Sequence, residues 1–139
     1  MAKRLCAILG ASGIVSQRLQ QRLANHPWFE LVAICGGPDT AGKPLSSIGW
    51  KLEQQRPTLA EITVLDLSNS KICKQLLELG VSIVFSAIPS EIAQDVEPML
   101  AESGFAVFSN ASAYRRVDGI PLVIAEINPQ HMEHFAVDG

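Results

Sequence analysis

The stretch Leu5-Cys-Ala-Ile-Leu-Gly10-Ala-Ser-Gly13-Ile-Val-Ser16 decides the fold of this chain. The apolar run that precedes Gly10 predicts a strand covered on both faces, and Gly10 then breaks the run. After Gly13, the residues Ile14, Val15, Leu19 and Leu23 recur at near-helical spacing, until His26-Pro27 ends the predicted helix. A strand, a tight glycine turn and a helix in this order are typical of a turn that binds phosphate groups.

The glycines follow a GxxGxxG spacing in which Ser16 takes the third place. Glycine lets the backbone turn sharply and approach a pyrophosphate, and the helix N-terminus adds free N–H groups and partial positive charge. Ser12 and Ser16 are candidate hydroxyl donors to the same phosphates. The alternative is that the glycines only make a tight turn, but the strand and helix around them favour phosphate binding.

Apolar runs and helical patterns alternate along the rest of the chain. We expect further strands at 31–35, 62–65, 81–85, 105–108 and 122–124, and helices at 72–79 and 90–103, with an irregular segment at 36–61. Apolar strands joined by helices predict right-handed parallel βαβ units. The expected fold class is therefore α/β: one Rossmann-type domain over residues 1–139, with a doubly wound, mainly parallel sheet of about six strands and helices on both faces.

Composition restricts the partners and the compartment. The chain has 139 residues, 47% of them hydrophobic and 18% charged, with a net charge of −3, which predicts a folded domain. Lys and Arg are adjacent only at Lys3-Arg4 and Arg115-Arg116, so we expect neither nucleic acid nor an anionic membrane as a partner. No apolar run approaches the roughly 18 residues of a membrane-spanning helix. The odd number of cysteines, three, favours the reducing cytoplasm.

No cysteine or histidine is a clear candidate for catalysis or metal binding. Cys6 and Cys35 fall in predicted strands and Cys73 in a predicted helix, and none is expected beside a histidine or a helix N-terminus that would stabilise a thiolate. His131 and His134 are three residues apart, but no third ligand accompanies them, which favours solvated helix positions. We therefore expect no catalytic residue and no metal site.

Three later motifs resemble those of one enzyme family. They are Ser86-Ala-Ile-Pro-Ser90, Ser109-Asn-Ala-Ser-Ala-Tyr-Arg115 and Pro121-Leu-Val-Ile-Ala-Glu-Ile-Asn-Pro129. With the glycine turn in register before them, the chain resembles aspartate-semialdehyde dehydrogenase, and more closely the branch found in archaea and fungi. The resemblance covers essentially all 139 residues.

This resemblance implies a reaction and a set of site residues. The family reduces aspartyl phosphate to aspartate semialdehyde with NADPH, through a cysteine thioester, and releases phosphate. By resemblance the cofactor is NADP, with NAD as the alternative, and its phosphates contact Gly10, Ser12, Gly13 and Ile14. By the same resemblance, Ser86 and Pro89 line the nicotinamide side, and Asn110 and Arg115 face the substrate phosphate.

Two departures from the family limit these expectations. The loop after the second strand reads Cys35-Gly-Gly-Pro-Asp39-Thr40, without the serine and arginine that hold a 2′-phosphate in the family, and Asp39 would repel that group. The choice between NADP and NAD therefore stays open. The family's nucleophilic cysteine and histidine base would come after Gly139, so we expect a cofactor domain without its catalytic and dimerisation domain. Its partners would be a nicotinamide dinucleotide and either a separate catalytic half or further copies of the chain.

Other functions remain on the same fold. One is a stand-alone nucleotide-binding module without catalysis, and others are the cofactor domain of a related malonyl-CoA reductase or of a different reductase. The motifs around Asn110 and Arg115 favour the semialdehyde dehydrogenase, because a nucleotide sensor has no need of a loop for a substrate phosphate.

Overall fold

The computed structural model describes residues 2–110, in which strands and helices alternate as expected. The strands are β1 (Arg4–Leu9), β2 (Phe29–Gly36), β3 (Leu65–Asp66), β4 (Ile83–Ser86) and β5 (Ala106–Ser109). The helices are α1 (Ile14–Leu23), α2 (Ile72–Glu78) and α3 (Ser90–Glu102), with a 3-10 turn η1 (Leu45–Ser47). The strand expected at 122–124 lies outside the described residues. No helix within residues 2–110 is long and apolar enough to cross a membrane.

The strands form one parallel sheet in the order β3-β2-β1-β4-β5. The chain moves outward from β1 through β2 to β3, and then returns to the other side of β1 to form β4. The direction of winding therefore reverses between β1 and β4. In open α/β sheets, ligands bind in the crevice beyond the carboxyl ends of the strands at this reversal.

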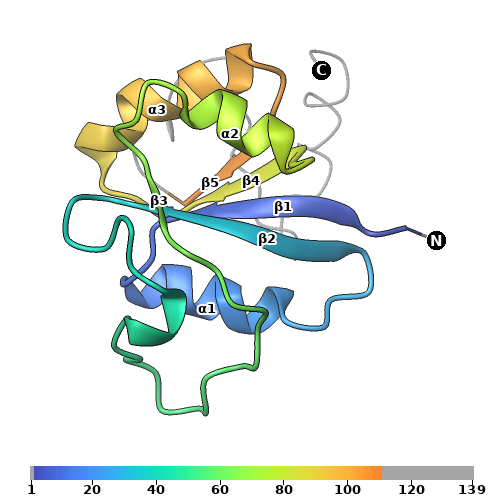
Figure 1. Ribbon diagram of the computed structural model, residues 1–139, viewed down its shortest axis with the longest axis vertical. Coiled ribbons are helices and arrows are strands. Elements are labelled where there is room, and N and C mark those ends of the chain that lie inside the picture. Colours follow the sequence, from blue (N-terminus) through green and yellow to red (C-terminus); the bar gives the residue numbers. More distant parts are fainter. Residues whose placement is uncertain (1, 111–139) are drawn as a thin grey trace, which may run out of the picture.

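Helices cover both faces of the sheet, which confirms the expected doubly wound α/β fold. Figure 1 shows α2 and α3 together on one face, and α1 with the segment that carries η1 on the other. Each face has its own apolar core. Under α2 and α3 it includes Leu9, Val84, Ile72, Leu76 and Leu100. On the α1 side it includes Ile8, Ile34, Leu45, Ile48 and Val64.

The side of α1 that faces the protein is more polar than its apolar spacing predicts, although Leu19 and Leu23 do pack in the core on this side as expected. Ile14 and Val15 are 60% and 43% exposed, whereas Ser16, Gln17 and Gln20 are buried. The buried amide of Gln17 is satisfied at both ends. Its Nε2 donates to the carbonyl of residue 49 at 2.7 Å, and its Oε1 accepts from the backbone N–H of residue 51 at 2.8 Å. A buried amide that is fully bonded incurs little desolvation penalty, so this face can be polar.

The third strand is shorter than predicted and begins later. Leu65 opens β3, while residues 62–64 pair in antiparallel fashion with residues 43–45: the Val64 N–H donates to the Lys43 carbonyl at 2.9 Å. Ile62 and Val64 bury their side chains in the core on the α1 side. The apolar character that predicted a strand at 62–65 therefore reflects a loop that covers the sheet.

Candidate functional site

The carboxyl ends of β1, β2 and β4 are tied together by backbone hydrogen bonds. The Gly10 N–H donates to the Cys35 carbonyl on β2 at 2.7 Å, and the Ala87 N–H, just after β4, donates to the Leu9 carbonyl at 2.9 Å. The turn at residues 10–13 therefore starts at the point where the winding of the sheet reverses.

The two glycines of this turn have different reasons to be glycine. Gly10 has a φ of +107°, and a Cβ on it would lie 2.7 Å from the Ala87 carbonyl oxygen, so the fold itself requires glycine there. Gly13 has an ordinary φ of −73°, and a Cβ on it would meet nothing within 4 Å. Nothing in the described part of the chain explains glycine at position 13, and the space beside it is open.

The N-terminus of α1 opens onto that space. Gly13 is the N-cap residue and supplies no side-chain cap, and the first turn of the helix contains no acidic residue. The first N–H groups of a helix have no partners within it, and the helix dipole adds partial positive charge there. Ser12 is half-buried before the cap, and Ile14 is exposed after it. This local geometry suits an anionic ligand.

Ser16 does not face this space, which corrects its assignment as a candidate phosphate donor. Its side chain is fully buried, and its Oγ donates to the Gly10 carbonyl. In the GxxGxxG pattern the third position permits close packing of the helix on the first strand. Serine is small enough to do so, and its hydroxyl also anchors the turn.

Ser86 and Pro89 lie at the carboxyl end of β4, as predicted. Ser86 is the register partner of Leu9 and ends the strand, and Pro89 is the N-cap residue of α3. Ser86 is 1% exposed, yet its Oγ has no hydrogen-bond partner among residues 2–110. A buried hydroxyl without a partner is costly, so this atom marks a position where a polar ligand group would be stabilising.

Asn110 joins the same edge of the sheet. It follows β5 directly, and its backbone N–H donates to the Ser86 carbonyl at 2.8 Å. The structure thus brings Gly10, Ser86 and Asn110 to the carboxyl ends of three neighbouring strands. Arg115, the other residue expected at the substrate phosphate, lies outside the described residues.

The loop after β2 folds back on itself at the carboxyl end of that strand. The N–H groups of Thr40 and Ala41 both donate to the Gly37 carbonyl, at 3.1 and 2.9 Å. Asp39, at the tip of this loop, is exposed. Lys43, the first cation after β2, is also exposed, but its backbone is bonded to residues 40 and 64.

The cysteines lie mostly where the sequence placed them. Burial raises the pKa of the Cys35 thiol to about 12, and burial together with the charge of Glu30 raises that of Cys6 to about 11. Both are therefore thiols at neutral pH. Cys73 is half-buried and is the second residue of α2, so the expectation that no cysteine lies at a helix N-terminus was wrong. Among residues 2–110, no group of three His, Cys, Asp or Glu side chains could hold a metal ion.

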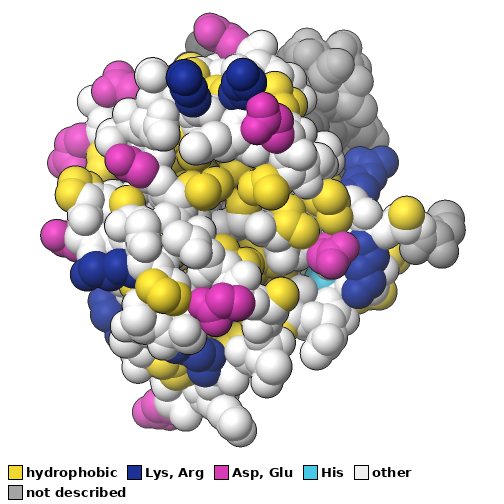
Figure 2. Space-filling model, viewed as in Figure 1, with side chains coloured by type: hydrophobic (Ala, Val, Ile, Leu, Met, Phe, Trp, Pro, Cys, Tyr) yellow, Lys and Arg dark blue, Asp and Glu magenta, His cyan; other side chains and the backbone are white. Residues whose placement is uncertain are grey.

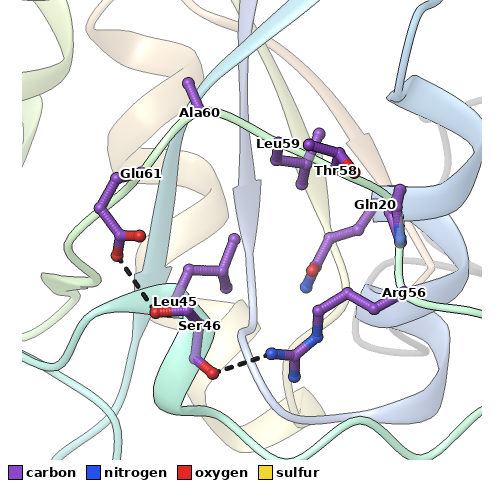
Figure 3. Close-up of a pocket in the computed structure, with 9 residues that line it drawn as sticks. Gln20, Leu45, Ser46, Arg56, Thr58, Leu59, Ala60 and Glu61 are labelled. Atoms are coloured by element: carbon purple, nitrogen blue, oxygen red, sulfur yellow. Dashed lines mark hydrogen bonds between the residues drawn. The ribbon is translucent and has the colours of Figure 1, made fainter.

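Two pockets lie away from the glycine turn. One, of about 140 Å³, is bounded by Gln20 of α1 and by the segment that carries η1 and Arg56. Figure 3 shows the Arg56 guanidinium directed at the Ser46 carbonyl, to which it donates at 2.9 Å. The same group also donates to the carbonyl of residue 48 and lies over the Trp50 ring, so Arg56 braces this segment.

The second pocket, of about 220 Å³, opens beside β2 and is lined by Val32, Leu65 and Leu79 among others. Figure 2 shows hydrophobic side chains across the middle of the face that carries β2 and α2, among acidic and basic ones that are interspersed. Neither pocket contains a residue of the 10–13 turn.

One polar residue at the site was missed by the sequence analysis. Glu97 of α3 is only 5% exposed, and its Oε2 accepts a hydrogen bond from the Ser109 Oγ at 2.6 Å. The signal that could have found it is its spacing, since Glu97 falls on the helical face of Ala93 and Leu100, where an apolar residue is expected.

The comparisons with known proteins agree with the predicted resemblance. A family model described as the NAD-binding domain of semialdehyde dehydrogenase matches residues 6–135. The aspartate-semialdehyde dehydrogenase of Archaeoglobus fulgidus is 41% identical over 126 residues, which make up 90% of this chain and 35% of that protein. That of Saccharomyces cerevisiae is 34% identical over 135 residues, 96% of this chain and 36% of that protein.

A solved structure extends the likeness to three dimensions. The crystal structure of the Candida albicans aspartate-semialdehyde dehydrogenase with NADP matches with a TM-score of 0.82 and 33% identity, over 95% of this chain and 36% of that one. The chain thus spans about a third of the length of these relatives. Since the family model matches nearly all of its residues, the chain belongs to the family of semialdehyde dehydrogenase NAD-binding domains.

Proposed function

We propose that this chain binds a nicotinamide dinucleotide with the pyrophosphate on the turn from Gly10 to Gly13. The observation that carries the proposal is the open space at Gly13, in front of an N-terminus of α1 that has no side-chain cap. In dinucleotide-binding turns, the second glycine lets the backbone approach the pyrophosphate, and the helix N–H groups then bind it. Ser12 and Ile14 flank this position and would contact the same phosphates.

The buried hydroxyl of Ser86 supports an orientation in which the nicotinamide half of the dinucleotide lies at the end of β4. Its Oγ has no partner among the described residues, and it sits at the end of β4, across the reversal point from β2. A nicotinamide carboxamide carries both a donor and an acceptor, either of which would satisfy this hydroxyl. The adenosine half would then extend toward the loop after β2, and Pro89 would bound the nicotinamide side.

Titration of the chain with NADP and with NAD tests this proposal. Calorimetry measures the affinity, and ligand-observed NMR detects weak binding. We expect measurable, weak binding of at least one dinucleotide, with backbone amide shifts concentrated at residues 10–16 and 86–90. Absence of binding of both at millimolar concentration would overturn the proposal.

We propose further that Asp39 keeps the preference for NADP over NAD small, on the order of tenfold, or about 1.4 kcal/mol. Its exposed carboxylate lies at the tip of the loop where a 2′-phosphate would approach, and Lys43 is the first cation that could oppose it. Replacement Asp39→Arg should raise the affinity for NADP at least tenfold and leave that for NAD nearly unchanged, because arginine binds phosphate in a bidentate manner.

The matched control is Glu78→Arg, which makes the same change in net charge on an exposed residue at the end of α2, away from the carboxyl ends of the strands. It should leave both affinities within about twofold. A preference for NADP above a thousandfold in the unmodified chain would show that another group holds the 2′-phosphate.

We propose that the complete function is that of an aspartate-semialdehyde dehydrogenase, for which these residues supply the cofactor domain. The nicotinamide, when bound, supplies the hydride; Asn110 and Arg115 would hold the substrate phosphate. The reaction also needs an activated thiol and an acid–base partner beside the nicotinamide. Cys6 and Cys35 are buried thiols, and Cys73 lies on α2 rather than with Ser86 and Pro89, which would line the nicotinamide. Without a catalytic half, the 139 residues alone should therefore show no dehydrogenase turnover, either in the reducing cytoplasm that we propose as their compartment or in a purified assay.

The assay mixes the chain with NADP, phosphate and aspartate semialdehyde and follows the absorbance of NADPH. Turnover that is lost on changing a single cysteine, such as Cys73→Ser, would contradict the proposal that the nucleophile lies elsewhere. Turnover that survives replacement of all three cysteines would identify a contaminating enzyme.

A further inference from the structure

Glu97 places a carboxylate in a layer that is otherwise apolar. It shares one face of α3 with Ala93 and Leu100, both of which are fully buried against the sheet. Burying a carboxylate costs free energy unless hydrogen bonds compensate, and an aliphatic side chain would pack in this layer without that cost. The hydrogen bond from the Ser109 Oγ, at 2.6 Å, is the interaction that a carboxylate provides here and an aliphatic residue does not.

That hydrogen bond holds the last residue of a short strand. Ser109 ends β5, which has four residues, and its register partner on β4 is Ser86. The next residue, Asn110, is bonded through its N–H to the Ser86 carbonyl at 2.8 Å. The end of β5 is thus held from the side by β4 and from the α3 face by Glu97.

We propose that Glu97 is a positioning residue that, through Ser109, fixes the end of β5 and thereby sets where Asn110 stands at the carboxyl edge of the sheet. The inference rests on the proposed function in one respect, namely that the group which Asn110 serves is the phosphate of an acyl phosphate. A side chain that must meet a phosphate works only if its backbone is held within a fraction of an ångström. A strand of four residues frays at its end unless it is fixed there.

The experiment reads the position of Asn110 directly and compares it with the overall stability. Hydrogen exchange by NMR gives the protection of the Asn110 amide, and the Gly10 amide, bonded to Cys35 in the centre of the sheet, serves as the internal reference. The variants are Glu97→Ala, Ser109→Ala and the double variant, with Glu97→Gln as the conservative change. Glu102→Ala, on an exposed glutamate of the same helix, is the matched control.

We expect Glu97→Ala and Ser109→Ala each to lower the protection of the Asn110 amide by about tenfold or more relative to the Gly10 amide. The double variant should be no worse than either single variant, because both remove the same hydrogen bond. Glu97→Gln should restore most of the protection, since its carboxamide oxygen still accepts from Ser109. Glu102→Ala should change nothing.

A second readout is the binding of inorganic phosphate, followed at the Asn110 side-chain amide. In the 139-residue chain we expect the two alanine variants to weaken it about fivefold to tenfold and Glu97→Gln to leave it within about twofold. If the unmodified chain leaves the Asn110 amide unshifted at high phosphate, the proposed role of Asn110 fails, while the exchange data still decide the role of Glu97.

Three results would overturn the positioning role. The first is a parallel fall in protection at Asn110 and Gly10, which would reduce Glu97 to a contribution to global stability. The second is additive losses in the double variant, which would show that the two side chains act separately. The third is a Glu97→Gln variant as impaired as Glu97→Ala, which would show that the hydrogen bond to Ser109 is not what matters.

Discussion

Replacement Gly13→Ala should abolish dinucleotide binding while leaving the fold intact. The added Cβ meets no protein atom within 4 Å, and the φ of −73° is ordinary for alanine. Losing a glycine favours folding by about 0.4–1 kcal/mol through the unfolded chain, and alanine as an N-cap residue costs a similar amount. The free energy of unfolding should therefore change by less than about 0.5 kcal/mol.

Binding responds differently, because the same Cβ enters the space that a pyrophosphate must occupy to reach the helix N–H groups. We expect the affinity for NADP and NAD to fall at least a hundredfold, or about 2.8 kcal/mol. Calorimetry measures the affinity, and thermal unfolding followed by circular dichroism measures the stability of the same sample.

Gly10→Ala is the matched comparison, and its main effect should be on the stability of the fold, which Gly13→Ala leaves almost unchanged. Its φ of +107° and the 2.7 Å approach of a Cβ to the Ala87 oxygen strain the fold itself. A penalty of about 1–3 kcal/mol follows, which lowers the melting temperature by roughly 3–10 °C for a chain of this size. If Gly13→Ala binds either dinucleotide as well as the unmodified chain does, the pyrophosphate does not lie on this turn.

Two further predictions concern titratable groups. At pH 8 the native chain should expose one reactive thiol to Ellman's reagent, that of Cys73, and three thiols after unfolding. The raised pKa values of Cys6 and Cys35, about 11 and 12, leave about a thousandth or less of each side chain as thiolate. More than one rapidly reacting thiol in the folded chain would contradict this. The side-chain and backbone hydrogen bonds from Ser68 lower the pKa of Asp66, so Ser68→Ala should raise it part of the way toward 3.8, as read from an NMR titration of the carboxyl carbon. The lowered pKa stabilises the folded state above pH 3.8, and that contribution disappears as the pH falls further. The variant should therefore be less stable than the unmodified chain at neutral pH but not at the acid end. An unchanged Asp66 titration would show that Ser68 does not lower this pKa.

The parts of the fold that could be predicted from the sequence are those in which one local signal dominates. The apolar run at Leu5 and the break at Gly10 have no other reasonable interpretation than a buried strand and a turn. Spacing alone predicts that Gly13 contacts the phosphates. The structure adds a reason that spacing cannot supply, because only three-dimensional packing distinguishes a glycine that the fold needs from one that it does not.

The remaining features depend on contacts between distant segments. Ile14 and Val15 have the spacing of a core-facing stripe, yet they are exposed, because the buried face of α1 bonds to a loop more than 30 residues later. The GxxGxxG spacing predicts Ser16 as a ligand donor, but its hydroxyl donates instead to the Gly10 carbonyl. Glu97 occupies a helix position where an apolar core residue is expected, although glutamate is usually exposed. Its burial depends on a hydrogen bond from Ser109, which lies on another element, β5.

The polar face of α1 has a consequence for the order of events during synthesis. A helix of ten residues is not stable on its own in water. Leu19 and Leu23 give this one apolar contact with the core, but its buried Gln17 finds its partners only at residues 49 and 51. Until that segment has left the ribosome, docking α1 on β1 and β2 would bury an amide without partners. The first βαβ unit should therefore not pack stably when only its own residues have emerged. Stable packing of α1 on β1 and β2 should follow once the loop that carries residues 49 and 51 has also emerged.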